Sequence, residues 1–222
     1  MKIETLHSIL RFLVRSLMRV EYSGTDYIPP EGGVIIATNH LSRLDIPILF
    51  VAPGRKDLTA LAADKYKYYP FFRWMLDTAR VVWIDRENAD FAAVRASVEY
   101  LRRGVALGIA PEGTRSKGEL IEGKAGTALI AEKARVPIVP VGIAGSESAV
   151  RKMLRLQRAR VMVRFGPSFM LTAINHQDRA EWLQRSTDEI MCRIAALLPS
   201  GYRGFYANHP RLSELLAGNN GQ

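Results

Sequence analysis

Short apolar stretches alternate with longer segments of helical periodicity along most of this chain, and this alternation limits the folds that the chain can adopt. The apolar stretches have the length of strands and lie at residues 33–39, 57–63, 80–85, 105–110, 136–145 and 160–166. Segments with helical spacing follow at residues 91–103, 125–134 and 177–198. Strands that alternate with helices form parallel sheets covered by those helices. We therefore expect an α/β fold, as a single layered domain with a largely parallel central sheet flanked by helices.

The N-terminal region predicts an amphipathic helix over residues 3–20. Apolar residues recur there at helical spacing, and Arg11, Arg15 and Arg19 form a basic stripe on the other side. The helix either lies in an anionic membrane interface or packs on its own domain, and the pattern leaves both open. Because no stretch of 18 uncharged apolar residues occurs, we do not expect the chain to span a membrane. The expected organisation is an N-terminal helix (1–22), a main domain (23–198) and a loop-like C-terminal tail (199–222).

The charge balance narrows the class of partner. The chain of 222 residues has 31 Lys and Arg against 22 Asp and Glu, a net charge of +9. Such an excess favours an anionic partner, either nucleic acid, an acidic membrane face or a phosphorylated substrate. The basic residues are spread along the chain and no nucleic-acid-binding motif is present, so we do not expect nucleic acid to bind. The single cysteine, Cys192, fits a small buried side chain in a reducing, cytosolic compartment.

Polar side chains follow three of the predicted strands at the point where each strand ends. They lie at residues 40–45, 85–86 and 112–115. The carboxyl ends of parallel strands meet at one edge of a sheet, where ligands bind in α/β proteins. We therefore expect these three loops to converge into one site.

His40 is the strongest candidate for a chemical role in this site. Its imidazole can act as a base near neutral pH, and Asp45 could accept a hydrogen bond from the second ring nitrogen and support the imidazolium. A structural role for Asp45 is the alternative. Ser42 and Asp45 have the spacing of a helix capping box, and Asp45 stands before Ile46-Pro47 as an N-cap would.

Arginines and a glycine turn supply candidate anion-binding groups. Arg86 lies just past an apolar strand, and Arg115 follows Gly113 in a tight turn. Lys65 and Lys124 are further candidate phosphate partners.

Several other chemistries are not supported by the sequence. Residues 118–125 have the glycine and lysine spacing of a P-loop, but Ala125 stands where the magnesium-binding Ser or Thr is needed. The nucleophile-elbow motif of serine hydrolases is absent. Four scattered histidines and one cysteine show no metal-site spacing. We expect neither a metal nor a cofactor.

Four ordered blocks in the chain resemble those of the lysophospholipid acyltransferases, and most closely the 1-acylglycerol-3-phosphate acyltransferases. They are NH-x-S-x-x-D at 39–45, the apolar run ending in IDR at 80–86, PEGTRS at 111–116 and VPIVPV at 136–141. The segment 65–76 resembles the Lys-rich segment of that subfamily. The chain departs from the family pattern at Arg73 and at Ala79-Arg80, where glycines are usual. The resemblance covers about residues 35–145.

The resemblance implies transfer of a fatty acyl group from an acyl thioester to the free hydroxyl of 1-acylglycerol 3-phosphate (lysophosphatidic acid), which gives phosphatidic acid. The thioester would be carried by coenzyme A or acyl carrier protein as a co-substrate. His40 would act as general base and Asp45 would orient it, with no covalent intermediate, metal or cofactor. The groups implied to bind the substrate phosphate are Arg86, Arg115 and Lys65. Those implied to position the acceptor or to stabilise the oxyanion are Glu112, Gly113 and Thr114.

Two alternatives to this function remain. The same blocks could serve another lysophospholipid or an aminolipid acceptor, or the chain could be a non-catalytic basic module that binds membranes. Because the substrates are amphiphiles, we expect the protein to be peripheral on the cytoplasmic face of the cell membrane. The candidate docking elements are residues 3–20 and 65–76.

Overall fold

The computed structural model describes residues 3–85, 90–173 and 178–219 and contains one sheet of seven strands in the order β1-β7-β6-β2-β5-β3-β4. The strands are β1 (Met18–Ser23), β2 (Val34–Thr38), β3 (Thr59–Ala63), β4 (Val82–Ile84), β5 (Ala106–Ile109), β6 (Ile138–Ala144) and β7 (Ala159–Phe165). Strands β6 and β7 pair antiparallel, whereas the other neighbouring strands pair parallel. The predicted fold class, with its largely parallel sheet and N-terminal helix, is confirmed.

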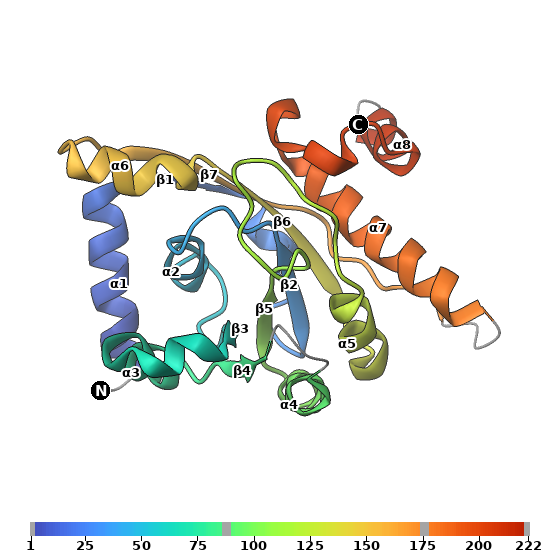
Figure 1. Cartoon of the computed structure of the whole chain (residues 1–222), viewed down its shortest axis with the longest axis horizontal. Helices are drawn as coiled ribbons and strands as arrows, with labels where there is room; N and C mark the ends of the chain where they lie inside the picture. The colour runs from blue at the N-terminus through green and yellow to red at the C-terminus, as the bar shows by residue number, and fades with distance from the viewer. Residues whose placement is uncertain (1–2, 86–89, 174–177, 220–222) are drawn as a thin grey trace.

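Helices cover both faces of this sheet (Figure 1). They are α1 (Ile3–Leu17), α2 (Asp45–Phe50), α3 (Pro70–Thr78), α4 (Phe91–Arg102), α5 (Gly126–Ala134), α6 (Ala149–Leu154), α7 (Arg179–Leu197) and α8 (Pro210–Asn219). Helices α4, α5, α7 and α8 pack on one face, and α1, α2 and α6 pack on the other.

Strand β2 lies at the centre of the sheet and is buried on both faces. Ile35 and Ala37 point into the core under α4, α5 and α7, while Val34 and Ile36 point into the core under α1 and α2. Alternate side chains of a strand point to opposite faces, so a strand covered on both faces is apolar at every position. This explains why the segment is a continuous apolar run, and it fixes where His40 emerges.

The N-terminal helix is shorter than predicted. It ends at Leu17, and residues 18–23 form the edge strand β1, which pairs with β7 in parallel. Met18 is buried, Arg19 and Glu21 are exposed, and Val20 lies half-buried between them. This alternation has the period of a strand, and pairing with β7 favours it over continuation of the helix.

The C-terminal segment is also more ordered than the predicted loop. It forms short 3-10 turns and helix α8, and it buries Tyr206 and Leu212 completely. The Tyr206 hydroxyl accepts a hydrogen bond from the Gly123 N–H at 3.0 Å, so this segment holds the loop between β5 and α5. The sequence predicted a loop here, whereas contacts with α7 and with the loop between β5 and α5 give the segment its structure.

Strands β2 to β6 are mutually parallel, so their carboxyl ends lie at the same edge of the sheet. His40 follows β2, Asp85 follows β4, and Glu112 follows β5. Ser146 follows β6 at the same edge, in the short 3-10 helix η3 (Ser146–Ser148).

Candidate active site

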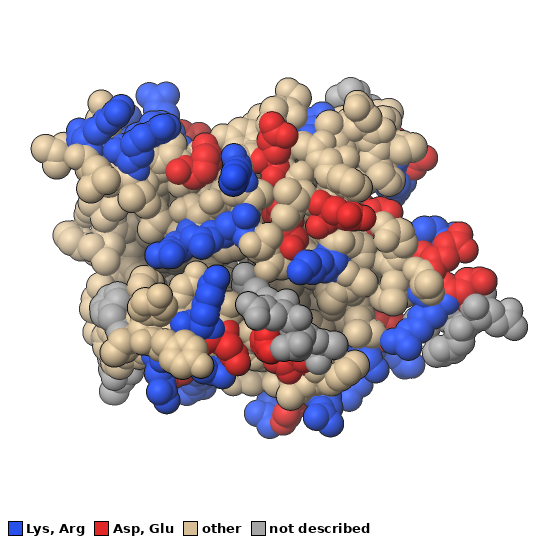
Figure 2. All heavy atoms as spheres, in the orientation of Figure 1, with Lys and Arg blue, Asp and Glu red and all other residues tan. Residues whose placement is uncertain are grey.

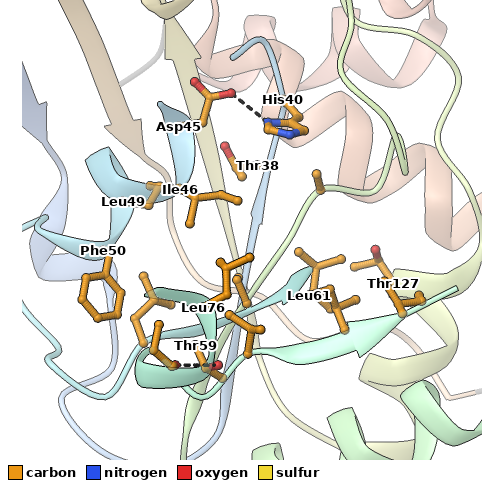
Figure 3. Close-up of a pocket in the computed structure, with 18 of the residues that line it drawn as sticks. Thr38, His40, Asp45, Ile46, Leu49, Phe50, Thr59, Leu61, Leu76 and Thr127 are labelled. Atoms are coloured by element: carbon orange, nitrogen blue, oxygen red, sulfur yellow. Dashed lines mark hydrogen bonds and ion pairs between the residues drawn. The ribbon is translucent and has the colours of Figure 1, made fainter. Parts of the chain in front are cut away.

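His40 and Asp45 form a hydrogen-bonded pair at this edge of the sheet. The His40 Nδ1 atom lies 2.9 Å from Asp45 Oδ2, and Asp45 is only 1% exposed (Figure 3). His40 leaves the end of β2, while Asp45 is the first residue of α2, so a five-residue turn brings the two side chains together.

The Asp45 carboxylate is surrounded by hydrogen-bond donors. Its Oδ2 atom accepts the backbone N–H groups of Leu41 and Ser42, each at 2.7 Å. Its Oδ1 atom accepts the Ser146 hydroxyl at 2.5 Å. An ionised carboxylate only accepts hydrogen bonds, so the proton between the pair belongs on His40 Nδ1. This leaves the Nε2 lone pair of the neutral ring available as a base.

The two interpretations of Asp45 are therefore compatible. The Ser42 N–H donates to Asp45 Oδ2, as it would in a capping box, but Ser42 lies three residues before the helix and not at its N-cap; the same oxygen also binds His40. The helix begins at Asp45 itself, with Leu44 in the cap position, so Asp45 is not the N-cap that the sequence suggested.

Glu112 holds the backbone of His40. Its Oε1 atom accepts the His40 N–H at 2.9 Å and its Oε2 atom accepts the Ile121 N–H at 3.2 Å, while the Ser116 N–H donates to His40 O at 2.8 Å. Glu112 is completely buried, and this burial raises its pKa to about 7. The Asp45 charge adds to this rise, and the two N–H donors oppose it. This buried carboxyl group positions the His40 loop, and its role in positioning an acceptor stays a prediction.

A cavity of about 310 Å³ opens beside His40. Figure 3 shows His40 and Asp45 at one end, with Leu49, Leu61 and Leu76 from different elements farther along. Helix α1 contributes Leu6 and Leu10 to the wall, and α5 contributes Ile130. Most of the lining is apolar, so the cavity suits a hydrocarbon chain placed next to a base.

The predicted basic residues fall into different positions. Arg115 and Lys65 are exposed and lie outside the cavity wall, whereas Lys124 is exposed and lines the cavity with His40. Arg86 lies outside the described residues. The role of these side chains in phosphate binding stays a prediction.

The turn after β5 contains Gly113, one of the groups predicted to position the acceptor or stabilise the oxyanion. Its N–H donates to Ala110 O at 3.0 Å and so closes the turn, while the oxyanion role of this turn stays a prediction. Gly113 has φ of 68°, and a side chain in its place would meet Lys124, which explains the glycine. Thr114 is exposed next to it.

The sequence did not identify two residues that organise the site. Ser146 lies 101 positions from Asp45, in a segment with no predicted role. The side-chain amide of Asn39 donates to Ile143 O and accepts from Ile143 N, both at 2.8 Å, and so extends the pairing of β2 with β6. The adjacent glycine and serines after an apolar strand were the only signal for Ser146.

Other predicted features can be compared with the described part of the chain. Cys192 is completely buried, as expected, and burial raises the pKa of its thiol to about 12. Within residues 3–85, 90–173 and 178–219, no cluster of three His, Cys, Asp or Glu side chains could hold a metal ion. In that same part, no helix is both long and apolar enough to cross a membrane.

Comparisons with known proteins agree with the blocks seen in the sequence. The acyltransferase family model matches residues 19–144, more than half of the chain. A Mycoplasma pneumoniae protein named probable 1-acyl-sn-glycerol-3-phosphate acyltransferase is 35% identical over 139 residues, which are 60% of this chain and 52% of that protein. A 1-acyl-sn-glycerol-3-phosphate acyltransferase of Cocos nucifera is 36% identical over 138 residues, 59% of this chain and 44% of the relative. The chain thus spans about half the length of the curated relatives it matches.

The fold has a counterpart among solved structures. The crystal structure of the 1-acyl-sn-glycerophosphate (LPA) acyltransferase PlsC from Thermotoga maritima superposes with a TM-score of 0.66. It is 22% identical, and the match covers 85% of this chain and 79% of that one. This similarity concerns the fold, and the match of the family model supplies the assignment. The chain belongs to the acyltransferase family.

Proposed function

We propose that the protein transfers a fatty acyl group from an acyl thioester to the free hydroxyl of 1-acylglycerol 3-phosphate. The observation that carries this proposal is the His40–Asp45 pair at the end of an apolar cavity. Nε2 of His40 takes the proton of the acceptor hydroxyl, and the acceptor oxygen attacks the thioester carbonyl. The tetrahedral intermediate collapses with cleavage of the C–S bond, and the departing thiolate takes the proton back from the imidazolium. Asp45 supports the imidazolium while it is charged.

The shape of the cavity supports a lipid substrate. An acyl chain that occupies the apolar part places its carbonyl near His40, because the pair lies at the end of the cavity. Holding the two reactants together supplies much of the rate enhancement in an enzyme without a covalent intermediate. The donor carrier, coenzyme A or acyl carrier protein, remains outside the apolar part.

The acceptor phosphate needs cationic partners at the cavity mouth. Lys124 is the first of these, because it lines the cavity with His40. Arg115 and Lys65 are exposed and can reach a bound headgroup only from outside the cavity wall. Arg86 completes the set proposed from the sequence. The names of the two curated relatives support lysophosphatidic acid as the acceptor.

We further propose that the protein works as a peripheral protein on the cytoplasmic face of the cell membrane. Helix α1 packs on the domain through Leu6 and Val14, while Phe12 on its other side is 70% exposed. Tyr68 and Tyr69, just before α3, are 85% and 58% exposed. Both expected docking elements therefore present apolar or aromatic surface, together with the basic residues noted in their sequences.

The proposal is tested by acceptor-dependent release of thiol from an acyl thioester with lysophosphatidic acid. We expect His40→Ala to lower the rate roughly 10²–10⁴-fold, the range for loss of a general base. His209→Ala is the matched control, because His209 also lies near an aspartate, with Nε2 3.9 Å from Asp188, but away from the cavity. Near-normal transfer by folded His40→Ala would refute the mechanism.

The same assay separates the alternatives. A panel of lysophospholipids and aminolipids identifies a different acceptor, and thiol release without an acceptor indicates a thioesterase. Salt-sensitive lipid binding with no thiol release from any donor would favour the non-catalytic membrane module.

A further inference from the structure

The connection between β6 and β7 ends in an exposed apolar tip. We call residues 149–158, which comprise α6 and the turn after it, the α6 tip. Ala149 is completely buried in the core, but Val150, Leu154 and Leu156 are 53%, 82% and 98% exposed. Three apolar side chains on one short connection form a surface that water solvates poorly.

The backbone at Leu156 strengthens this observation. Its φ of 56° lies in the left-handed region, which favours glycine or asparagine over leucine. A leucine here is unfavourable for the backbone and, with almost its whole side chain in water, gains nothing from packing inside the protein. Contact with a partner outside the protein would offset this cost.

The charge around these leucines indicates the kind of partner. Residues 149–160 contain five basic residues and no acidic one. The basic residues are Arg151, Lys152, Arg155, Arg158 and Arg160. Figure 2 shows Lys and Arg side chains gathered at the corner of the molecule where Figure 1 draws α6. Apolar tips ringed by cations fit the interface of an anionic bilayer, where the tips reach the acyl region and the cations meet headgroup phosphates.

The α6 tip is tied to the end of α1, a helix that carries a second exposed apolar surface. The guanidinium of Arg158 donates to Met18 O at 3.2 Å and also to Arg15 O, so the tip is tied to the end of α1. Phe12 and Leu13 of α1 are 70% and 42% exposed. Figure 1 draws α6 across the end of α1 at one side of the molecule.

The α6 tip is also connected to the active site. The segment that leads into it begins with Ser146, whose hydroxyl binds Asp45. A bilayer that contacts the tip is therefore held near the edge of the sheet from which His40 emerges. A soluble acidic protein would pair with the arginines, but it would not require exposed leucines between them.

We propose that the α6 tip is a membrane-docking element, with Leu154 and Leu156 inserted among the lipids and Arg151 and Arg155 on anionic headgroups. The proposal rests on the proposed function for the class of partner, since a lipid substrate requires a lipid surface. It adds a docking element that is distinct from α1 and from residues 65–76.

Sedimentation of the full chain with vesicles tests the proposal. Vesicles of phosphatidylcholine with about 30% phosphatidylglycerol, which supply the anionic headgroups that attract basic residues, are compared with pure phosphatidylcholine. We expect Leu154→Ser combined with Leu156→Ser to weaken binding to the anionic vesicles at least about tenfold. We expect Arg151→Gln with Arg155→Gln to weaken it roughly tenfold to thirtyfold there, with a small effect on neutral vesicles.

The matched control combines Phe91→Ser with Met170→Ser. These side chains are 71% and 56% exposed and lie outside the α6 tip and α1, so binding should equal that of the wild type. Circular dichroism and thermal unfolding establish that each variant folds. Binding of the leucine variant equal to that of the wild type would overturn the proposal. The proposal would also be overturned if the leucine variant lost binding to soluble polyglutamate as strongly as it lost binding to vesicles. That result would identify an acidic protein surface as the partner.

Acyl transfer measured with short-chain substrates dissolved as monomers separates this proposal from the proposed function. The α6-tip variants should keep the wild-type rate in this assay, because none of the changed residues lines the cavity. Normal transfer with unchanged vesicle binding refutes the docking element alone. Absence of transfer in the wild type refutes the proposed function and leaves the vesicle result to decide docking.

Discussion

The active-site edge of the sheet and the side formed by α1 and α6 place their side chains in opposite ways. At the active-site edge, Asp45 and Glu112 are 1% and 0% exposed, and each accepts hydrogen bonds from several groups of the protein. On the other side, Phe12 and Leu156 are 70% and 98% exposed. Both arrangements reverse the usual distribution of polar and apolar residues.

This difference indicates whether a side chain has its interaction partners inside the protein or outside it. A buried carboxylate is stable only because its hydrogen-bond donors lie inside the protein, so the chemistry is organised before any substrate arrives. An exposed apolar side chain gains only from a partner outside. Changes at the first region should therefore alter the rate on soluble substrates, and changes to the exposed side chains of the second should alter only binding to lipid.

The largest expected effect comes from removing the charge of Asp45 while keeping its shape. In Asp45→Asn the amide oxygen can still accept hydrogen bonds from the backbone N–H groups of Leu41 and Ser42, and the amide nitrogen can donate to the Ser146 hydroxyl. The fold should survive, but the imidazolium of His40 loses its counter-charge, and we expect kcat to fall roughly 10²–10⁴-fold. Steady-state kinetics with monomeric substrates measure this, with thermal unfolding as the control for folding. A kcat within about tenfold of the wild type would mean that the pair is only structural.

Glu112 allows a test by pH. Burial raises its pKa from 4.5 to about 7, so the folded protein keeps a proton that the unfolded chain loses between these values. The free energy of unfolding should therefore fall as pH rises through this window and level off above it, by up to roughly 3 kcal/mol.

Glu112→Gln provides the reference, because glutamine does not titrate. Urea unfolding of both proteins from pH 4.5, the ordinary pKa, to above 7 gives the difference in stability at each pH. We expect the wild type to lose stability relative to Glu112→Gln as pH rises. The other titrating groups are the same in both proteins, so their contributions cancel. A difference that stays constant with pH would show that Glu112 is ionised throughout, held by the His40 and Ile121 N–H groups.

Much of the active-site edge could be predicted from sequence, since it follows from strand ends. Parallel strands place their carboxyl ends together, so the loops at His40 and Glu112 had to meet once the apolar runs were identified as strands. The partners of Asp45 could not be predicted in full. The Ser146 contact spans 101 positions and depends on how β6 lies beside β2, which no local pattern encodes.

On the side formed by α1 and α6, the sequence shows which residues are apolar or basic. It does not show which of them are exposed, and their role depends on that exposure. The stripe on α1 contains both Val14, which is buried, and Phe12, which is not. Residues 18–20 continue the helical pattern and also alternate as a strand does, and only pairing with β7 selects the strand.

A smaller effect is expected from Ser146, which acts on the reaction through Asp45. Ser146→Ala removes a hydrogen bond to a charged oxygen, and we expect kcat to fall about tenfold with KM little changed. The pH–rate profile should move as well, because the support of Asp45 for the His40 imidazolium changes, and Ser146→Thr should restore both. Ser148→Ala is the matched control, since its hydroxyl donates to Gly145 O and not to Asp45. An unchanged profile with lower stability would mean that Ser146 only packs.

The smallest expected effect comes from comparing the exposed and the buried side of helix α1. Phe12→Ser on the outer side of α1 should leave the free energy of unfolding within about 0.5 kcal/mol of the wild type, as for other exposed positions. It should also weaken binding to anionic vesicles a few-fold, about half the effect of the double leucine change. Val14→Ala on the inner side is 5% exposed in the wild type, and it should lower the stability by about 2 kcal/mol with no direct effect on vesicle binding. If Phe12→Ser destabilises the protein as much as Val14→Ala does, the outer side of α1 packs on protein. The exposed apolar surface would then be limited to α6.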